Sequence, residues 1–265
     1  MSDTVLTSRA GDVATLTLNR PEQLNAITVE LGRALEHALL DAARDARVIV
    51  IRGSGGNFCA GGDFRELERL RAQGREAMAR LFTNFAAACS LIGTLPVPVV
   101  CAVEGFAMAG GFELAQAADI VLLHENAILA DTHTKFGQIP GGGGSQRLPR
   151  LVGRQRALAH ILTADRLTAA EALDWGLAYR VYAAAEFDTA VPAFAARLAR
   201  RDRTALAASK SLVQQGLRLP LAEGLDLEQR TVLDHLAGGD AGAGIAAFTA
   251  RDQSDRNAHG ERTSR

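Results

Sequence analysis

The sequence predicts an α/β protein with a parallel sheet in its first part and helices at its end. An alternating strand at Val13–Leu18, a helix starting after Thr28 and a wholly apolar strand at Val48–Ile51 follow one another. A strand, a helix and a strand in this order favour a right-handed crossover with parallel pairing, which covers the second strand on both faces. Beyond Tyr182 the chain is rich in alanine, so we expect a helical packing and assembly region that begins near residue 195.

Composition and charge exclude several classes of protein. With 48% hydrophobic residues among 265, the chain can bury a substantial core and is not disordered as a whole. Its 29 basic and 30 acidic residues give a net charge of −1, which offers no electrostatic case for nucleic acid or an anionic membrane as a partner. No apolar stretch reaches the roughly 18 residues of a membrane span, and the start lacks a signal-peptide pattern, so we expect a cytoplasmic protein.

The three cysteines, Cys59, Cys89 and Cys101, have neither C-x-x-C spacing nor histidines at metal-ligand intervals. This pattern fits neither a disulfide framework nor a zinc site. We therefore expect three buried thiols.

A glycine-dense loop follows the first helix and the buried strand. The helix is capped by Thr28 and extends to about Ala46, and the loop is Gly53–Asp63, at the sheet edge where ligands of parallel sheets bind. Its glycines do not match the G-x-G-x-x-G pattern of dinucleotide sites. Asp63 is a good N-cap for the next helix, and Gly62 could offer its N–H outward. The alternative is a flexible surface loop.

A second glycine-containing turn lies near the middle of the chain. A helical pattern at Phe64–Ile92 and an apolar strand at Val99–Val103 precede Ala107–Ala115, which runs through two glycines into an alanine-rich helix. The first N–H groups of a helix lack partners and its dipole favours negative charge, which is typical of an anion or oxyanion site. Glu113 lies one short turn further. The alternative is a helix start whose acidic residue only complements the dipole.

The following segment combines possible acid–base groups with more glycine. A buried strand at Asp119–Leu123 leads to Asp131 and His133, two residues apart, and then to Gly141–Gly144. Because no Lys-Ser or Lys-Thr pair follows these glycines, they do not form a P-loop, and we expect a close-packed turn with Ser145 capping a helix. Taken alone, His133 is expected to be a hydrogen-bonded structural histidine.

The last third is predicted as helices. Thr168–Glu171 is a capping box, and Gly176 ends the short helix that it starts. Asn257–Arg265 is expected to be a frayed tail. The later helices are expected at Ala190–Ala199, Ala205–Gly216, Leu221–Leu236 and Gly242–Arg251.

Five segments in this order and spacing resemble the enoyl-CoA hydratase/isomerase (crotonase) superfamily, over nearly the whole chain. The segments are Asn19–Pro21 with Asn25–Ala26, Phe58–Asp63, Gly105–Ala115, Pro140–Arg147 and Ala246–Phe248. The resemblance implies a ClpP/crotonase-like spiral of ββα units, with an acyl-CoA-binding core at residues 1–195 and a helical trimerisation region at residues 196–265. It also implies homotrimers, or hexamers made of two trimers. No metal or redox cofactor is implied, and coenzyme A enters as part of the acyl-CoA thioester substrate.

The resemblance also assigns roles to residues of the site. The N–H groups of Gly62 and Gly110 match the oxyanion hole that holds the thioester oxygen. Further residues match the substrate-binding positions of the family: Leu24, Ala26, Ala60, Gly61, Asp63 and Gly141.

The hydratases of the family use two glutamates. Glu113 matches the first, and His133 occupies the position of the second. Because imidazole carries protons near neutral pH, His133 is a candidate for the second acid–base group. The sequence therefore favours a hydratase, a lyase that adds water to a 2-enoyl-CoA. The alternatives are a double-bond isomerase that uses Glu113 alone, with His133 shaping the pocket, and a catalytically silent acyl-CoA-binding protein.

Overall fold

The computed structural model describes residues 4–238. Contacts between residues divide the chain into two compact units, Met1–Arg203 and Thr204–Arg265. Helix α7 (Ala184–Ala199) spans the boundary expected between residues 195 and 196. Three features of the sequence analysis lie outside the described residues: the helix Gly242–Arg251, the segment Ala246–Phe248 and the tail Asn257–Arg265.

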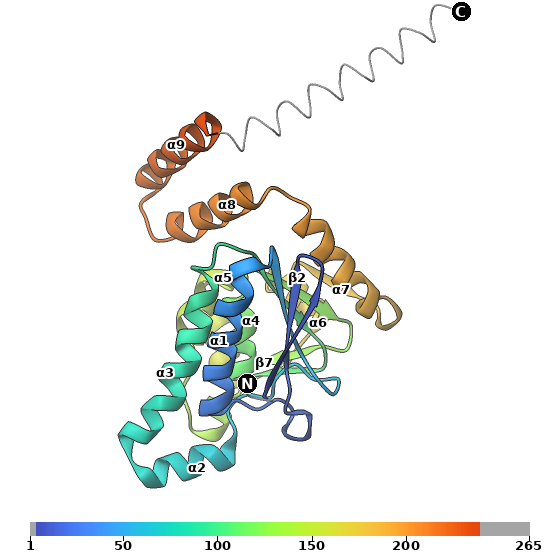
Figure 1. Cartoon of the computed structure of the whole chain (residues 1–265). Helices are drawn as coiled ribbons and strands as arrows, with labels where there is room; N and C mark the ends of the chain where they lie inside the picture. Colours follow the sequence, from blue (N-terminus) through green and yellow to red (C-terminus); the bar gives the residue numbers. More distant parts are fainter. Residues whose placement is uncertain (1–3, 239–265) are drawn as a thin grey trace, which may run out of the picture. The chain divides into compact units, whose positions relative to one another are not determined.

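The first unit is built on a six-stranded sheet (Figure 1). The strands lie in the order β1 (Val5–Ala10), β2 (Val13–Leu18), β3 (Val48–Gly53), β4 (Val99–Val103), β6 (Ile120–His124) and β9 (Arg180–Tyr182). β1 and β2 form an antiparallel hairpin, and every later pair of neighbours is parallel. The pairing of β2 with β3, in which Val13 lies opposite Val48, confirms the predicted parallel arrangement.

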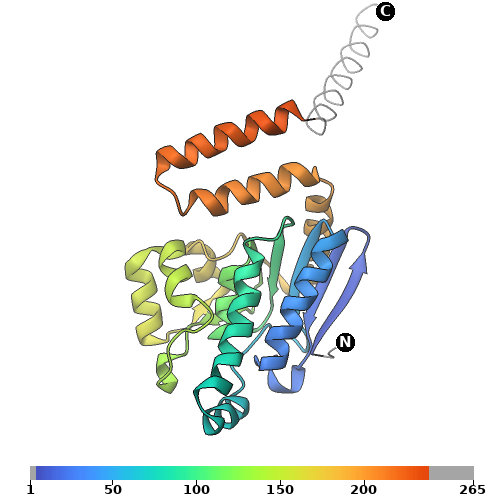
Figure 2. The ribbon, with the colours of Figure 1, turned by 60° about the vertical axis from the view of Figure 1, so that its left-hand side comes forward.

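Different helices cover the two faces of this sheet. Ile49 and Ile51 of β3 belong to a core that includes α1 (Val29–Asp45) and α3 (Arg75–Ile92), two helices that lie side by side (Figure 1, Figure 2). Val48 and Val50 belong to a second core, which α7 closes. Successive β3 residues thus reach opposite faces, as the two-residue period of a strand requires. The apolar run at Val48–Ile51 is therefore buried on both sides, as predicted.

A smaller sheet carries the central turn. Its strands lie in the order β5 (Phe106–Met108), β7 (Ile128–Ala130) and β8 (Leu167–Thr168). The chain passes from β4 in the large sheet to β5 in the small one at Gly105, whose φ of +58° is in the left-handed region. A Cβ at Gly105 would collide with the carbonyl oxygen of Gly56, so a side chain at this crossing is excluded by both conformation and space.

The helix starts of the first unit follow the predicted capping signals. The Thr28 side chain accepts the N–H of Leu31 at the start of α1, and Thr168 forms a capping box with Glu171. Asp63 accepts two N–H groups of the next helix. The remaining helices of this unit are α2 (Phe64–Gln73), α4 (Gly110–Ala117), α5 (Gly144–Thr163) and α6 (Ala169–Asp174), with single 3₁₀ turns at Pro21–Gln23 and Thr134–Phe136.

Two expectations about helix boundaries are wrong. The continuous helical pattern at Phe64–Ile92 is interrupted at Gly74, whose φ of +94° separates α2 from α3. Ser145 does not cap α5, because the cap is Gly143 at φ +111° and the helix starts at Gly144. Glycine fits this cap because a side chain is strained at that φ.

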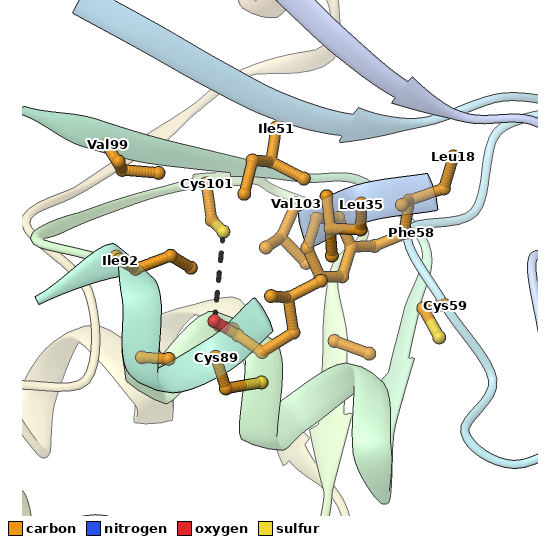
Figure 3. Close-up of a cluster of buried hydrophobic side chains, with 14 of the residues drawn as sticks. Leu18, Leu35, Ile51, Phe58, Cys59, Cys89, Ile92, Val99, Cys101 and Val103 are labelled. Carbon is orange, nitrogen blue, oxygen red and sulfur yellow. Dashed lines mark hydrogen bonds between the residues drawn. The ribbon is translucent and has the colours of Figure 1, made fainter. Parts of the chain in front are cut away.

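The three cysteines are buried thiols, as predicted. Figure 3 shows Cys59, Cys89 and Cys101 in an apolar cluster with residues such as Phe58 and Ile92. Burial raises the pKa of the Cys59 and Cys89 thiols to about 12 and also raises the pKa of Cys101. Residues 4–238 contain no group of three or more His, Cys, Asp or Glu side chains arranged to hold a metal ion.

The described part of the second unit consists of helices. Most of α8 (Arg203–Gly216) and all of α9 (Leu221–Ala237) belong to it, and neither helix has a buried residue among those described. Large apolar side chains are exposed on both, for example Val213, Leu221 and Leu233. Throughout residues 4–238, no helix is both long enough and apolar enough to cross a membrane.

Candidate active site

The two glycine-containing turns predicted from the sequence are joined through main-chain contacts. The N–H of Cys59, in the loop after β3, donates to Phe106 O at 2.8 Å, and Met108 N–H donates back to Cys59 O at 2.9 Å. Immediately after β5, a Cβ on Gly111 would collide with the carbonyl oxygen of Cys59. Only glycine allows this approach, and the two turns are thereby held in one fixed arrangement.

The backbone directs the N–H of Gly62 away from its neighbouring strand segment. Ile27 donates to Gly61 O at 2.7 Å and accepts from Asp63 N at 2.9 Å, which pairs Ile27 with Gly62 in a parallel bridge. In such a bridge the residue between the two bonded ones points its own N–H to the opposite side. Residues 4–238 offer this N–H no acceptor, and Gly62 lines a cavity.

Gly110 lines the same cavity, and its N–H also has no acceptor among residues 4–238. It is the first residue of α4, where N–H groups have no partner within the helix and the helix dipole favours negative charge. The preceding Ala109 has φ +46° and ψ −114°, a strained conformation for an alanine, and its N–H is bonded to Ala130 O at 2.8 Å. A Cβ on Gly110 would lie 2.5 Å from Ile27 Cδ1, so a side chain here would displace the end of the Ile27 side chain.

Gly61 brings the two free N–H groups near each other. Its φ is +98°, and a Cβ placed on it would lie 2.9 Å from Ala109 Cβ and 3.6 Å from Gly110 N. The peptide before Gly62 therefore packs directly against the peptide before Gly110. Both main-chain donors thus belong to one site, which is the pairing that the resemblance implies.

Glu113 lies on α4 and is held by the glycines that follow β7. Its side chain is 2% exposed, and Oε1 accepts the N–H groups of Gly142 and Gly144, each at 2.8 Å. Oε2 is left facing His133 Nε2 at 3.7 Å. Burial raises the pKa of Glu113, and the two N–H groups and His133 only partly oppose it. The glycine turn predicted at Gly141–Gly144 thus binds one carboxylate oxygen of Glu113 through two N–H groups.

His133 faces Glu113 from the segment after β7. Its Nδ1 lies 2.7 Å from Asp131 Oδ1, so the nitrogen turned towards the cavity is Nε2. Burial lowers the pKa of the imidazole, but the hydrogen bond and charge of Asp131 and the charge of Glu113 outweigh it and raise the pKa above its ordinary value. His133 is therefore hydrogen-bonded, as expected, and also lines the cavity.

The cavity has a volume of about 70 Å³ and is mostly apolar. Glu113 and His133 are the titratable groups among its lining residues in the described part of the chain. Most of the apolar lining comes from α2, α3 and the 3₁₀ turn after β7. Phe64 of α2 and Phe136 of the 3₁₀ turn make an edge-to-face contact at 5.1 Å. The apolar side chains of the wall are Ile27, Phe64, Leu67, Leu81, Phe82, Phe85 and Phe136.

Of the six predicted substrate-binding residues, only Ala60 lines this cavity in the described part of the chain, and Leu24 has an exposed side chain outside the lining. Ala60 lines it, and its N–H is bonded to Leu24 O at 2.9 Å. Ala26 is buried outside the lining, as is Gly61. Gly141 packs on Phe82, and its neighbour Gly142 reaches the cavity instead.

Asp63 faces away from the cavity. Its carboxylate caps α2 and pairs with Arg20 at 2.8 Å. Burial would raise the pKa of Asp63, but the Arg20 guanidinium and the N–H groups of Glu66 and Arg65 outweigh it and lower the pKa. This carboxylate is thus engaged in holding the loop to the start of α2.

The sequence assigns no role at the site to three residues that shape it. These are Asp131, which holds His133, and the pair Gly142 and Gly144, which holds Glu113. The two-residue spacing of Asp131 and His133 was the available signal, but spacing alone does not show that both side chains turn to the same side. The glycine run does not indicate that its N–H groups bind Glu113, because this acceptor lies about 30 residues earlier in the chain.

Comparison with known proteins agrees with this fold. The sequence model of the enoyl-CoA hydratase/isomerase family matches residues 8–256. A Rhizobium meliloti (strain 1021) protein named as a probable enoyl-CoA hydratase is 36% identical over 255 residues, which cover 96% of this chain and 97% of the relative.

Solved structures with the same fold span almost the whole chain. The crystal structure of an enoyl-CoA hydratase from Polaromonas sp. JS666 superposes with a TM-score of 0.90 at 32% identity, covering 93% of this chain and 97% of that one. A Thermobifida fusca YX protein in complex with acetoacetyl-CoA has a TM-score of 0.82 at 31% identity, covering 89% and 95%. The chain adopts the crotonase fold and belongs to the enoyl-CoA hydratase/isomerase family.

Proposed function

We propose that this protein is an enoyl-CoA hydratase that adds water across the 2,3 double bond of an enoyl-CoA thioester. The observation that carries the proposal is the 3.7 Å separation of Glu113 Oε2 and His133 Nε2 in a cavity that also receives the N–H groups of Gly62 and Gly110. Membership of the family and the acetoacetyl-CoA complex of a structural neighbour support an acyl-CoA as the ligand.

In the proposed reaction the two glycine N–H groups bind the thioester carbonyl oxygen. As water adds to the β-carbon, negative charge develops on this oxygen, and Gly62 and Gly110 stabilise the resulting enolate. One such donor typically lowers a barrier by about 3 kcal/mol. Because both donors belong to packed main chain, they require little reorganisation as the charge develops.

In the proposed reaction Glu113 takes up one proton and His133 releases one. The Glu113 carboxylate accepts a proton from water as the water oxygen bonds to the β-carbon, and the double-bond electrons move towards the thioester. The His133 imidazolium then donates its Nε2 proton to the α-carbon, giving the 3-hydroxyacyl-CoA. Glu113 now carries a proton and His133 is neutral, so transfer from Oε2 to Nε2 restores both groups. The proposed steps involve no metal or redox cofactor.

An isomerase is the second candidate, and one feature of Glu113 favours it. Its Oε1 is occupied by two N–H groups, which leaves Oε2 as a single base beside the proposed oxyanion hole. One such oxygen can remove a proton from one carbon of the enoyl thioester, which forms a dienolate, and return the proton to another carbon. In that reaction His133 only shapes the pocket.

The two candidates differ in the mass of the product. The purified protein is incubated with a panel of 2-enoyl- and 3-enoyl-CoA esters, and products are identified by mass spectrometry. A gain of one water supports the hydratase, whereas a migrated double bond at unchanged mass identifies the isomerase. Tight binding without any product would identify a silent acyl-CoA-binding protein.

A Glu113→Gln variant tests the role of the carboxylate within the same assay. It should abolish turnover and preserve binding of the CoA ester, because the side chain keeps its shape and loses its basicity. Glu186→Gln, an exposed position on α7, is the matched control and should retain full activity. Full turnover by Glu113→Gln would contradict the assignment.

We also propose that the predicted trimerisation region, residues 196–265, mediates the trimeric or hexameric assembly that the family resemblance implies. The exposed leucines and valines of α8 and α9 support this role, since such surfaces are typical of protein–protein contacts. Light scattering on the purified chain tests the proposal, and a monomer at micromolar concentration would contradict it.

A further inference from the structure

The carboxylate of Asp131 is buried behind the proposed catalytic pair. Asp131 directly follows β7 and is 0% exposed. Its Oδ1 lies 2.7 Å from His133 Nδ1 and also accepts the main-chain N–H of His133 at 3.3 Å. Two bonds from one carboxylate oxygen to the same residue fix both the backbone turn and the plane of the imidazole.

Within residues 4–238, no lysine or arginine forms an ion pair with Asp131, and its Oδ2 has no hydrogen-bond partner. A buried carboxylate is costly unless a charge or hydrogen bonds compensate it. The imidazolium of His133 is the group placed to do so. This pairing is therefore electrostatic as well as geometric.

His160 approaches Asp131 from α5 without supplying a positive charge. Its Nε2 accepts the main-chain N–H of Asp131 at 3.0 Å, which requires an unprotonated Nε2. Burial lowers the pKa of His160, so the ring is neutral around pH 7. It packs against the rings of Phe112 and Trp175 and holds the Asp131 backbone in place. The charged partner of Asp131 is consequently His133.

We infer that Asp131 is the positioning residue of this site: by binding Nδ1–H of His133, it makes Nε2 the atom that exchanges protons beside Glu113. The inference rests on the proposed function, since the proton delivered from Nε2 is the one required at the α-carbon. Asp131 touches no reacting atom and acts only through His133.

Few other groups near His133 could determine which of its ring nitrogens carries the proton. The charged groups facing it are Asp131 from its own segment and Glu113 from α4, and α3 contributes the uncharged rings of Phe82 and Phe85 to the same cavity. Glu113 faces the Nε2 side of the ring. The Nδ1 proton is therefore fixed by Asp131.

The first test uses the wild-type protein without substrate. ¹H–¹⁵N NMR of the imidazole is recorded across pH, and His133→Gln identifies the signals of His133. The expected result is a neutral form protonated on Nδ1, with a downfield Nδ1 proton and a titration midpoint above the ordinary value. A neutral form protonated on Nε2 would overturn the inference, whatever reaction the protein catalyses.

The second test is Asp131→Asn, which keeps the size of the side chain and removes its charge. If the substrate panel confirms hydration, kcat should fall by about 10²-fold or more with KM changed less than about threefold, because proton donation is impaired rather than binding. The alkaline limb of the kcat profile should move to lower pH, since loss of the carboxylate lowers the pKa of His133. Asp188→Asn, a surface residue paired with Arg52, is the control and should leave both quantities unchanged.

Melting temperature is measured for each variant so that a loss of folding is recognised. If Asp131→Asn does not fold, the wild-type NMR result decides the inference. An unchanged kcat and pH profile in a folded Asp131→Asn variant would overturn it. Failure of the proposed function would appear differently, as absence of hydration by the wild-type protein with the Nδ1 proton still bound to Asp131.

Discussion

The N–H of Gly144 donates to Glu113 Oε1 at 2.8 Å, so the first residue of α5 orients a carboxylate on α4. The N–H of Gly142 donates to the same oxygen. The position of Glu113 therefore depends on a main-chain segment about 30 residues later in the chain. The first prediction concerns this contact.

Gly144→Ala should impair turnover by displacing Glu113. A Cβ at position 144 would lie 3.1 Å from both Cγ and Oε1 of Glu113, so the buried carboxylate has to shift by a few tenths of an ångström. Because a displacement of about 1 Å at a catalytic group costs about 10²-fold, this smaller shift should reduce kcat by about tenfold. Steady-state kinetics with an enoyl-CoA measures the loss, and the exposed neighbouring substitution Ser145→Ala should have almost no effect. Equal activity of the two variants would show that the contact with Gly144 does not position Glu113.

His133→Gln should separate hydration from isomerisation. Glutamine retains hydrogen bonding but carries no exchangeable acidic proton near neutral pH, so hydration should slow by about 10²- to 10⁴-fold. Isomerisation through Glu113 alone should continue. Measuring both products with the same variant decides the role of His133, and hydration at the parental rate would remove it from the mechanism.

The rate of hydration should depend on pH as a bell-shaped curve. Activity requires ionised Glu113, whose pKa is raised above the reference value of 4.5, so it falls as pH drops through that raised pKa. It also requires protonated His133, whose pKa is raised above 6.5, so it falls again as pH rises through that pKa. The two apparent values belong to the coupled pair. A kcat profile measures them, and an alkaline limb below pH 6.5 would contradict the assigned protonation of His133.

The cavity should favour acyl groups with uncharged tails. In the described part of the chain its lining contains several phenylalanines and neither lysine nor arginine. A terminal carboxylate would be buried there without a partner, at a cost of several kcal/mol. For two enoyl-CoA esters of equal length, kcat/KM should be at least about 10²-fold lower for the one with a terminal carboxylate. Comparable values would show that this tail leaves the cavity.

Gly111→Ala should destabilise the fold as well as the site. Its Cβ would collide with the carbonyl oxygen of Cys59, where a main-chain atom cannot rotate away. Such overpacking typically lowers the free energy of unfolding by about 3 kcal/mol. Denaturant unfolding measures the change. Gly216→Ala, where a Cβ would meet no atom within 4 Å, is the control and should not be destabilised.

Local signals explain why much of the fold was predictable. The strand at Val48–Ile51 is apolar at every position, and Thr28 and Thr168 start helices through side-chain bonds to residues three positions later. The break at Gly74 was missed because glycine also occurs inside helices, and φ cannot be read from the residue type. Serine is a common cap, which predicts Ser145, whereas Gly143 at φ +111° caps the helix.

The candidate site was predictable only in part. Gly62, Gly110, Glu113 and His133 follow from the family resemblance, and the structure places them around one cavity. The connection of Glu113 to the later glycines is a long-range contact, and no local pattern encodes it. For Asp131, the side chain turns towards His133 because the chain leaves β7 and forms a 3₁₀ turn, so strand-like alternation does not apply.

The peptide that joins the strained Ala109 to Gly110 carries one of the two main-chain donors of the site, and this limits what side-chain mutagenesis can detect. The N–H groups of Gly62 and Gly110 belong to the main chain. Replacing side chains one by one would therefore reveal the contributions of Glu113 and His133 but leave both amides chemically intact. Their contribution becomes visible only when the amide itself is exchanged for an ester by semisynthesis or unnatural-residue incorporation. Mutagenesis with natural amino acids would therefore underestimate the contribution of the main chain to catalysis.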